Sequence, residues 1–463
     1  ETLLKKKMGE FKPNQFANLK RNLYHHILTC LKLLATPKKI NIQIRELLDF
    51  AELLYDRGLY LQALKILNKA KKQAQESQYD VLHLETMEFE KRIESRHITR
   101  TGPSHNERLA EESSIRGQVV ANSAALSSLK QRLHSWFIRN GHVKNDAEKT
   151  DLIHFFHSYL PSNQENMTFF EKVYFYFSYV WYYHILLDFE QVINYSNKWI
   201  DLYKQQPIML EKDPILYLRG LHYLLIASWY CKDHTQYAYA IESLKNFEQG
   251  YQQKWGKNVQ VLAFTYDSFA ELNRIFWEGD IQQGLSIVSE ILTKLKKYDD
   301  YLDAHKIMII HYKLAWLYFC SKEKEKALVH LNIIFSHEAA HLREDLQIYA
   351  QLLALLTHYD LNNYSILDYR ILSCERFLKK TKNTDALQTL ILQLLKKLTS
   401  TKHQNKIALY QKALSDAKAL QKDAFLRRSF TYLDFILWLE HKLSKKSMES
   451  ILQSRFLAST VAN

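Results

Sequence analysis

The chain has 463 residues, of which 47% are hydrophobic and 13% aromatic, and it carries a formal net charge of +13 at pH 7. This aromatic and aliphatic content can bury a large apolar area, which excludes an intrinsically disordered chain. The helix-breaking residues glycine (10) and proline (6) are far below their usual shares of about 7% and 5%, and neither occurs after Gly284. Because tight β-hairpins mostly need glycine, the composition predicts a nearly all-helical protein.

Positive charge is concentrated at the start of the sequence. Residues 1–40 contain nine basic and two acidic residues, whereas the rest of the chain is nearly balanced. Such a segment is either a solvated basic end or a contact surface for an acidic partner or nucleic acid. Nucleic-acid or ribonucleoprotein binding through this segment is therefore an alternative function. The opening residues are charged and polar, so we expect no secretory leader.

The spacing of the cysteines and the hydropathy of the sequence indicate where in the cell the protein is located. The four cysteines are far apart, without CxxC spacing, and read as reduced, mostly buried thiols of a cytoplasmic protein. The most apolar stretch, Val173–Leu187, is shorter than the roughly 20 residues that a membrane-spanning helix needs, and it is rich in tyrosine. We therefore expect a buried helix there and no membrane association.

The clearest repeated unit is Leu47–Ala70, in which small and large residues alternate. Small side chains such as Ala51 and Ala63 let one helix approach another closely, because they admit a large side chain from the facing helix. This unit resembles the tetratricopeptide repeat (TPR), a helix–turn–helix motif. Gly58 and Tyr60 match the signature of its turn and second helix.

Weaker copies of this unit follow along the chain. Their equivalents of Gly58 fall at Leu187, Thr235, Gly279 and Lys322. The last three spacings are 48, 44 and 43 residues, longer than the usual repeat of about 34, as helices one turn longer would give. The resemblance, over roughly residues 40–100 and 165–380, implies an all-α fold: a right-handed α-solenoid of long helix-turn-helix (TPR-like) hairpins.

The sequence between and after these repeats completes the organisation. Arg96–Arg108 contains Gly102 and Pro103 and reads as a loop. Leu109–Gly141 is helical in pattern and forms either a long connecting helix, which we favour, or a mobile linker. The expected segments are basic helices and first hairpins (1–100), loop and connecting helix (101–150), solenoid (151–380) and C-terminal capping helices (381–463).

One short motif carries possible chemistry. His337-Glu338-Ala339-Ala340-His341 fits the H-E-x-x-H pattern of zinc metallopeptidases, with two histidine ligands on one helix face and a glutamate general base. A third ligand is needed, and on spacing alone either Asp360 or Glu375 could supply it.

Three observations argue against catalysis at this motif. The chain has 20 histidines, so a chance match is not rare. No credible strand lies nearby to hold a substrate. The repeat register places the motif at a helix start, with Ser336 as the expected N-cap. We therefore expect ordinary histidines, with a metal at His337 and His341 as a remote alternative.

Other enzyme signatures are missing from the sequence. Neither a Gly-rich phosphate loop nor a G-x-S-x-G elbow occurs. We accordingly expect a non-catalytic protein with no catalytic residue and no cofactor.

The resemblance also suggests where a partner binds. In TPR units, defined positions of the first helix line the concave face. One such position falls on Glu52, Trp229, Asn273 and Trp316, and another on Tyr55, Lys232, Phe276 and Phe319. Two tryptophans at one repeat position suggest an aromatic-lined groove for apolar or aromatic peptide segments, because the family's Lys/Asn set for a peptide carboxylate is missing. Alternatively, longer helices shift the register and bury both tryptophans in the core.

From this register we expect a protein or peptide partner, bound by a scaffold or adaptor. The candidate partner-binding residues are Tyr55, Trp229, Asn273 and Trp316. The identity of the partner and the oligomeric state are left open.

Overall fold

A computed structural model of the chain describes most of its residues. The description covers residues 13–461 except 36–38, 98–102, 162–163, 165, 252–254, 338–343, 382–384, 401–405 and 424, and it omits the side chains of 13–15, 103, 251, 381, 428, 460 and 461. Within these residues the elements are α-helices and short 3-10 segments, and no strand occurs. The all-α prediction is confirmed. None of the described helices is both long enough and apolar enough to cross a membrane.

The chain divides into two compact units, and the first comprises residues 1–128 and 161–172. Its helices are α2 (Pro13–Ala35), α3 (Ile40–Tyr55), α4 (Tyr60–Glu76), α5 (Asp80–Arg96) and the first part of α6 (Pro103–Asn140). Helices α3, α4 and α5 pack successively, as in a helical-repeat solenoid. The turn between α3 and α4 contains Gly58 at φ +74°, a left-handed conformation that favours glycine.

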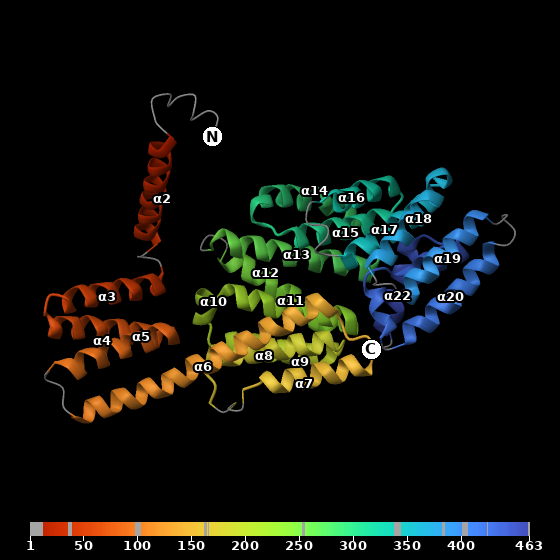
Figure 1. Ribbon diagram of the computed structural model, residues 1–463. Coiled ribbons are helices and arrows are strands. Elements are labelled where there is room, and N and C mark those ends of the chain that lie inside the picture. Colours follow the sequence, from red (N-terminus) through yellow and green to blue (C-terminus); the bar gives the residue numbers. More distant parts are fainter. Residues whose placement is uncertain are drawn as a thin grey trace. The chain divides into compact units, whose positions relative to one another are not determined.

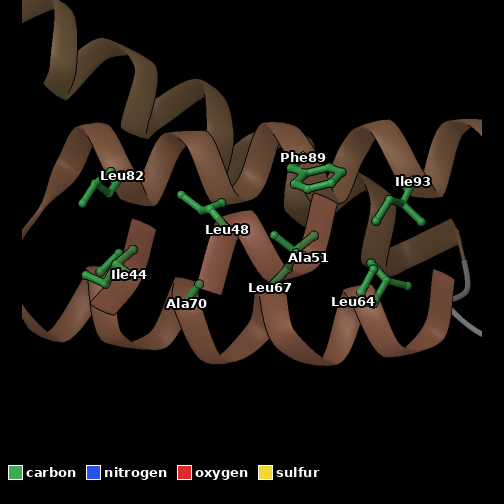
Figure 2. Close-up of a cluster of buried hydrophobic side chains, with 11 residues drawn as sticks. Ile44, Leu48, Ala51, Leu64, Leu67, Ala70, Leu82, Phe89 and Ile93 are labelled. Carbon is green, nitrogen blue, oxygen red and sulfur yellow. The ribbon is translucent and has the colours of Figure 1, made fainter. Parts of the chain in front are cut away.

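The core of this first unit explains why small residues recur in the sequence. Ala51 of α3 and Ala63 and Ala70 of α4 are fully buried. Figure 2 shows the large side chains that pack around such positions, among them Leu48, Leu67 and Phe89. The small residues bring α3 and α4 close together, and the large ones fill the space between the three helices.

The loop predicted over Arg96–Arg108 is too long. Helix α5 continues to Arg96 and α6 begins at Pro103. Proline suits the first position of a helix, because an amide hydrogen there would have no partner within the helix. The segment Leu109–Gly141, for which a connecting helix was favoured, lies within α6 up to Asn140.

The second unit comprises residues 129–160 and 173–463. Its helices are the rest of α6, α7 (Asp146–Tyr159), α8 (Phe169–Ile185, from residue 173), α9 (Phe189–Gln205), α10 (Ile208–Lys212), α11 (Pro214–Cys231), α12 (His234–Tyr251), α13 (Lys257–Glu278), α14 (Ile281–Lys297), α15 (Ala304–Cys320), α16 (Lys324–Ser336), α17 (Glu344–Asp360), α18 (Tyr364–Thr381), α19 (Ala386–Ser400), α20 (Lys406–Lys422), α21 (Phe435–Ser444) and α22 (Met448–Val461). Its described residues also form the 3-10 segments η2 (Asp299–Tyr301) and η5 (Leu426–Thr431). Successive helices such as α15, α16 and α17 pack side by side (Figure 1), as in a helical-repeat solenoid.

One contact in the second unit breaks this sequential order. Helix α22 packs against α13, far earlier in the chain. Gly279, at φ +77° after α13, lies so close to α22 that a Cβ atom there would come within 2.6 Å of the Gln453 backbone nitrogen. The Gln453 side-chain amide donates a hydrogen bond of 3.2 Å to the Gly279 carbonyl oxygen. Glycine is therefore required at position 279 both by the conformation and by the close approach.

Candidate ligand-binding cavity

A cavity of about 1010 Å³ lies within the second unit. Its walls come from the ends of α11 and α13, the middle of α15, the start of α9 and the C-terminal elements η5, α21 and α22, with Leu346 of α17 and Gln421 of α20. Its size is that of sites that enclose a small ligand or a few residues of a peptide. Its aromatic lining residues are Phe189, Trp229, Tyr230, Phe276, Trp277, Tyr312, Trp316, Phe430, Tyr432 and Phe456.

Three of the four residues predicted to contact a partner line this cavity. Trp229 of α11, Asn273 of α13 and Trp316 of α15 come from helices that pack in order, α11 on α13 and α13 on α15. Both tryptophans are half-buried. Neither tryptophan is therefore completely buried in the core, the alternative that the register left open.

Tyr55 does not belong to this site. It lies at the end of α3 in the first unit, and its ring packs against the rings of Tyr60, Phe89 and His97 at centroid distances of 5.6, 5.8 and 5.7 Å. Among the residues at the same repeat position as Tyr55, Lys232 and Phe276 line the cavity. Phe319 is fully buried instead.

Asn273 is held by a lysine of the neighbouring helix. Lys313 of α15 donates a hydrogen bond from Nζ to Asn273 Oδ1, and both residues line the cavity. Lys313 belongs to none of the ion pairs among the described residues. Burial without a compensating carboxylate disfavours the charged amine and lowers the pKa of Lys313 to about 8.

A second lysine lies over two aromatic rings of the cavity. Lys232, at the C-cap of α11 with φ +60°, places Nζ 4.6 Å from the Trp229 ring centroid and 5.2 Å from that of Trp277. The π faces attract the ammonium group. The residue keeps contact with solvent, yet desolvation of its amine by the cavity walls, opposed by Asp434 and reinforced by Arg455, lowers its pKa to about 8.

Trp229 also carries an unused hydrogen-bond donor. Its Nε1 is buried and has no hydrogen-bond partner among the described residues. A buried N–H group without a partner costs free energy, of the order of 1–3 kcal/mol.

The C-terminal wall of the cavity is fixed by arginines. Arg455 of α22 pairs with Asp434 at 2.7 Å and with Glu440 at 2.9 Å. Arg427 of η5 donates a hydrogen bond of 3.2 Å to the Leu187 carbonyl oxygen. Residues 381–463 were predicted only as capping helices, and no motif in that segment indicated that it lines a cavity.

The H-E-x-x-H motif is only partly described. Glu338 and His341 lie outside the described residues, and His337 is the C-cap of α16. Ser336 is the last residue of α16, and its hydroxyl donates to the Asn332 carbonyl oxygen at 2.9 Å. The prediction that Ser336 is an N-cap is therefore wrong, because its side chain bonds back into the helix it ends.

The carboxylates considered as third zinc ligands have other partners. Asp360 is paired with Lys324 and Lys442 and accepts a hydrogen bond from Trp438. Glu375 pairs with Lys396 at 2.7 Å. Within the described part of the chain, no group of three or more His, Cys, Asp or Glu side chains is placed to hold a metal ion.

The basic N-terminal segment is described only in part. Lys5, Lys6, Lys7, Lys12 and Lys38 lie outside the described residues. Of the remainder, Lys32 of α2 lies 3.7 Å from Asp49, and both side chains are exposed. Binding of nucleic acid by this segment stays a prediction.

The chain was compared with known proteins in three ways. No protein-family model, no curated protein and no solved structure matches the chain.

Proposed function

We propose that this protein is a non-catalytic scaffold or adaptor that binds a segment of a protein or peptide in the aromatic-lined cavity of its second unit. The observation that carries the proposal is that Trp229 and Trp316, at equivalent positions of the two expected repeats on either side of the one that contains Asn273, both line this cavity. Tryptophan is enriched among the residues that contribute most to binding, because a large rigid ring gains much contact area at a small entropic cost.

The proposed architecture is a TPR-like solenoid, supported by the packed hairpins and by the small residues between α3 and α4.

A cytoplasmic location is supported by the four free cysteines, since a reducing compartment keeps thiols unpaired. Two of them, Cys30 and Cys231, are exposed, so the expectation that the thiols are mostly buried is wrong. Cys231, the last residue of α11, lines the cavity.

The test is selection of short peptides from a random library by the purified full chain. We expect the wild type to enrich peptides with apolar or aromatic residues. Trp229→Ala combined with Trp316→Ala should weaken their binding at least about tenfold, because two anchoring rings are lost.

The matched control is Trp255→Ala, which removes a half-buried tryptophan of the same unit that does not line the cavity. It should leave peptide binding unchanged. If the double variant keeps its helical circular dichroism and binds the selected peptides as tightly as the wild type, the cavity is not the binding site.

A further inference from the structure

Lys313 combines three features that the proposed binding of a peptide does not require. Its side chain lines a cavity large enough for a ligand, its amine donates to an amide oxygen, and it has no carboxylate partner among the described residues. Trp316 follows it by three residues on α15, and therefore shares its helix face. An ammonium group in such a place is poorly stabilised, so the neutral, nucleophilic amine is accessible near neutral pH.

We propose that this cavity binds an aldehyde or ketone with an apolar or aromatic body, covalently and reversibly, through an imine formed with the Lys313 amine. The proposal goes beyond peptide binding. It concerns the same cavity but stands on a different residue.

The condensation needs only groups that the cavity and the ligand supply. The lone pair of the unprotonated Lys313 nitrogen attacks the carbonyl carbon, and the π electrons of the C=O bond move to oxygen. A proton passes from nitrogen to oxygen and gives a carbinolamine. The C–O bond then breaks, water leaves with both former amine protons, and a C=N bond remains. No oxidant or reductant takes part.

The surroundings of Lys313 favour this product. Asn273 Oδ1 accepts a hydrogen bond from the amine and so holds the nitrogen in place. A neutral imine removes the cost of keeping an ammonium group away from water. The rings of Trp229, Phe276 and Trp316 offer contact area to the apolar body of the ligand.

Lys313 is a better candidate than Lys232. Lys232 is an exposed residue, and its amine is already engaged with the faces of the Trp229 and Trp277 rings. Among the described residues, the amine of Lys313 makes a single polar contact, with the amide oxygen of Asn273.

The experiment is reductive trapping on the full-length protein. The protein is mixed with benzaldehyde and sodium cyanoborohydride, and the benzylated lysines are located by peptide mass mapping. We expect Lys313 to be labelled at least about tenfold faster than Lys130, with a rate that rises from pH 7 to pH 9 as the amine loses its proton. Lys130 is the reference because burial lowers its pKa as well, whereas it does not line the cavity. A difference in rate between the two lysines therefore reports on the cavity and not on the pKa alone.

Two variants and one further probe sharpen the result. Lys313→Met should abolish the fast labelling, and Lys232→Met should preserve it. Glyoxylate, which has a carbonyl group but no apolar body, should label Lys313 more slowly than benzaldehyde. Labelling of Lys313 no faster than that of Lys130, or fast labelling lost only in Lys232→Met, would overturn the proposal.

The outcome is independent of the peptide experiment. Selected peptides can bind to a protein in which Lys313 is not labelled, which would leave the scaffold proposal standing. Fast labelling of Lys313 without peptide selection would leave the imine site standing alone.

Discussion

Trp438 of α21 donates a hydrogen bond of 3.0 Å from Nε1 to Oδ1 of Asp360, at the end of α17. The carboxylate is buried, with a side chain only 2% exposed, and it also pairs with Lys324 and with Lys442, whose Nζ lies 2.6 Å from Oδ1. Burial alone would raise the pKa of Asp360, but the two lysines outweigh it, and the net pKa lies below the usual value. This carboxylate therefore joins elements from two distant parts of the second unit.

We predict that Asp360→Ala destabilises the protein by about 3–5 kcal/mol, because it leaves two largely buried lysines and an indole N–H without their acceptor. The control is Asp201→Ala, which breaks an exposed pair with Lys204 and should cost no more than about 1 kcal/mol. Urea denaturation of both variants measures the difference. Equal losses of stability would show that the Asp360 cluster contributes no more than a surface ion pair.

Gly279→Ala tests the contact between α13 and α22. We expect a loss of about 2–4 kcal/mol, because alanine is strained at φ +77° and its Cβ would overlap the Gln453 backbone. Gly141→Ala is the matched control, since Gly141 has φ +73° and nothing within 4 Å of an added Cβ. It should show the strain alone, about 1–2 kcal/mol. Thermal unfolding followed by circular dichroism ranks the two variants, and the reverse order would contradict the close approach of α22.

A buried histidine pair makes stability depend on pH. His311 and His330 are 2.9 Å apart between their Nδ1 atoms, so one nitrogen must donate and the other accept. Burial, with a contribution from His311, lowers the pKa of His330 to about 4. The unfolded chain binds a proton near pH 6.5 whereas the folded protein does not, so stability is greatest above pH 6.5 and falls as the pH drops toward 4.

Between pH 6.5 and pH 4, the free energy of unfolding of His330→Phe should fall by about 1–3 kcal/mol less than that of the wild type, because phenylalanine takes up no proton. The ring would keep its place against Tyr318, on which His330 stacks at 5.5 Å. The exposed His154 on α7 supplies the control, and His154→Phe should leave the dependence as in the wild type. Urea denaturation at pH 7 and pH 5 measures the free energy of unfolding at each pH. If His330→Phe loses as much stability between these pH values as the wild type does, the histidine pair is not the cause of the pH dependence.

Sequence reasoning predicted the features that repeat. Ala51, Ala63 and Gly58 carry a local signature, because a small residue at a helix contact and a glycine at a turn recur at fixed offsets. The same periodicity placed Trp229, Asn273 and Trp316 at equivalent positions, and the structure brings them to one cavity.

Features that depend on contacts distant in sequence could not be predicted in this way. The pairing of Arg455 with Asp434 and the return of α22 to α13 leave no periodic pattern in the sequence. Lys313 looks like any helix-surface lysine until the facing helix supplies Asn273. Ser336 was misjudged because a serine after a helical run suits the last turn of one helix as well as the first turn of the next.

The contact between Gly279 and Gln453 spans 174 positions of the chain. In most helical repeats each hairpin touches only its neighbours, so such arrays can unfold piecemeal and fold from any starting point. Here α22 packs against α13 and so joins the end of the second unit to its middle hairpins. We therefore expect residues 279–453 to gain protection from amide hydrogen exchange as one cooperative block rather than hairpin by hairpin.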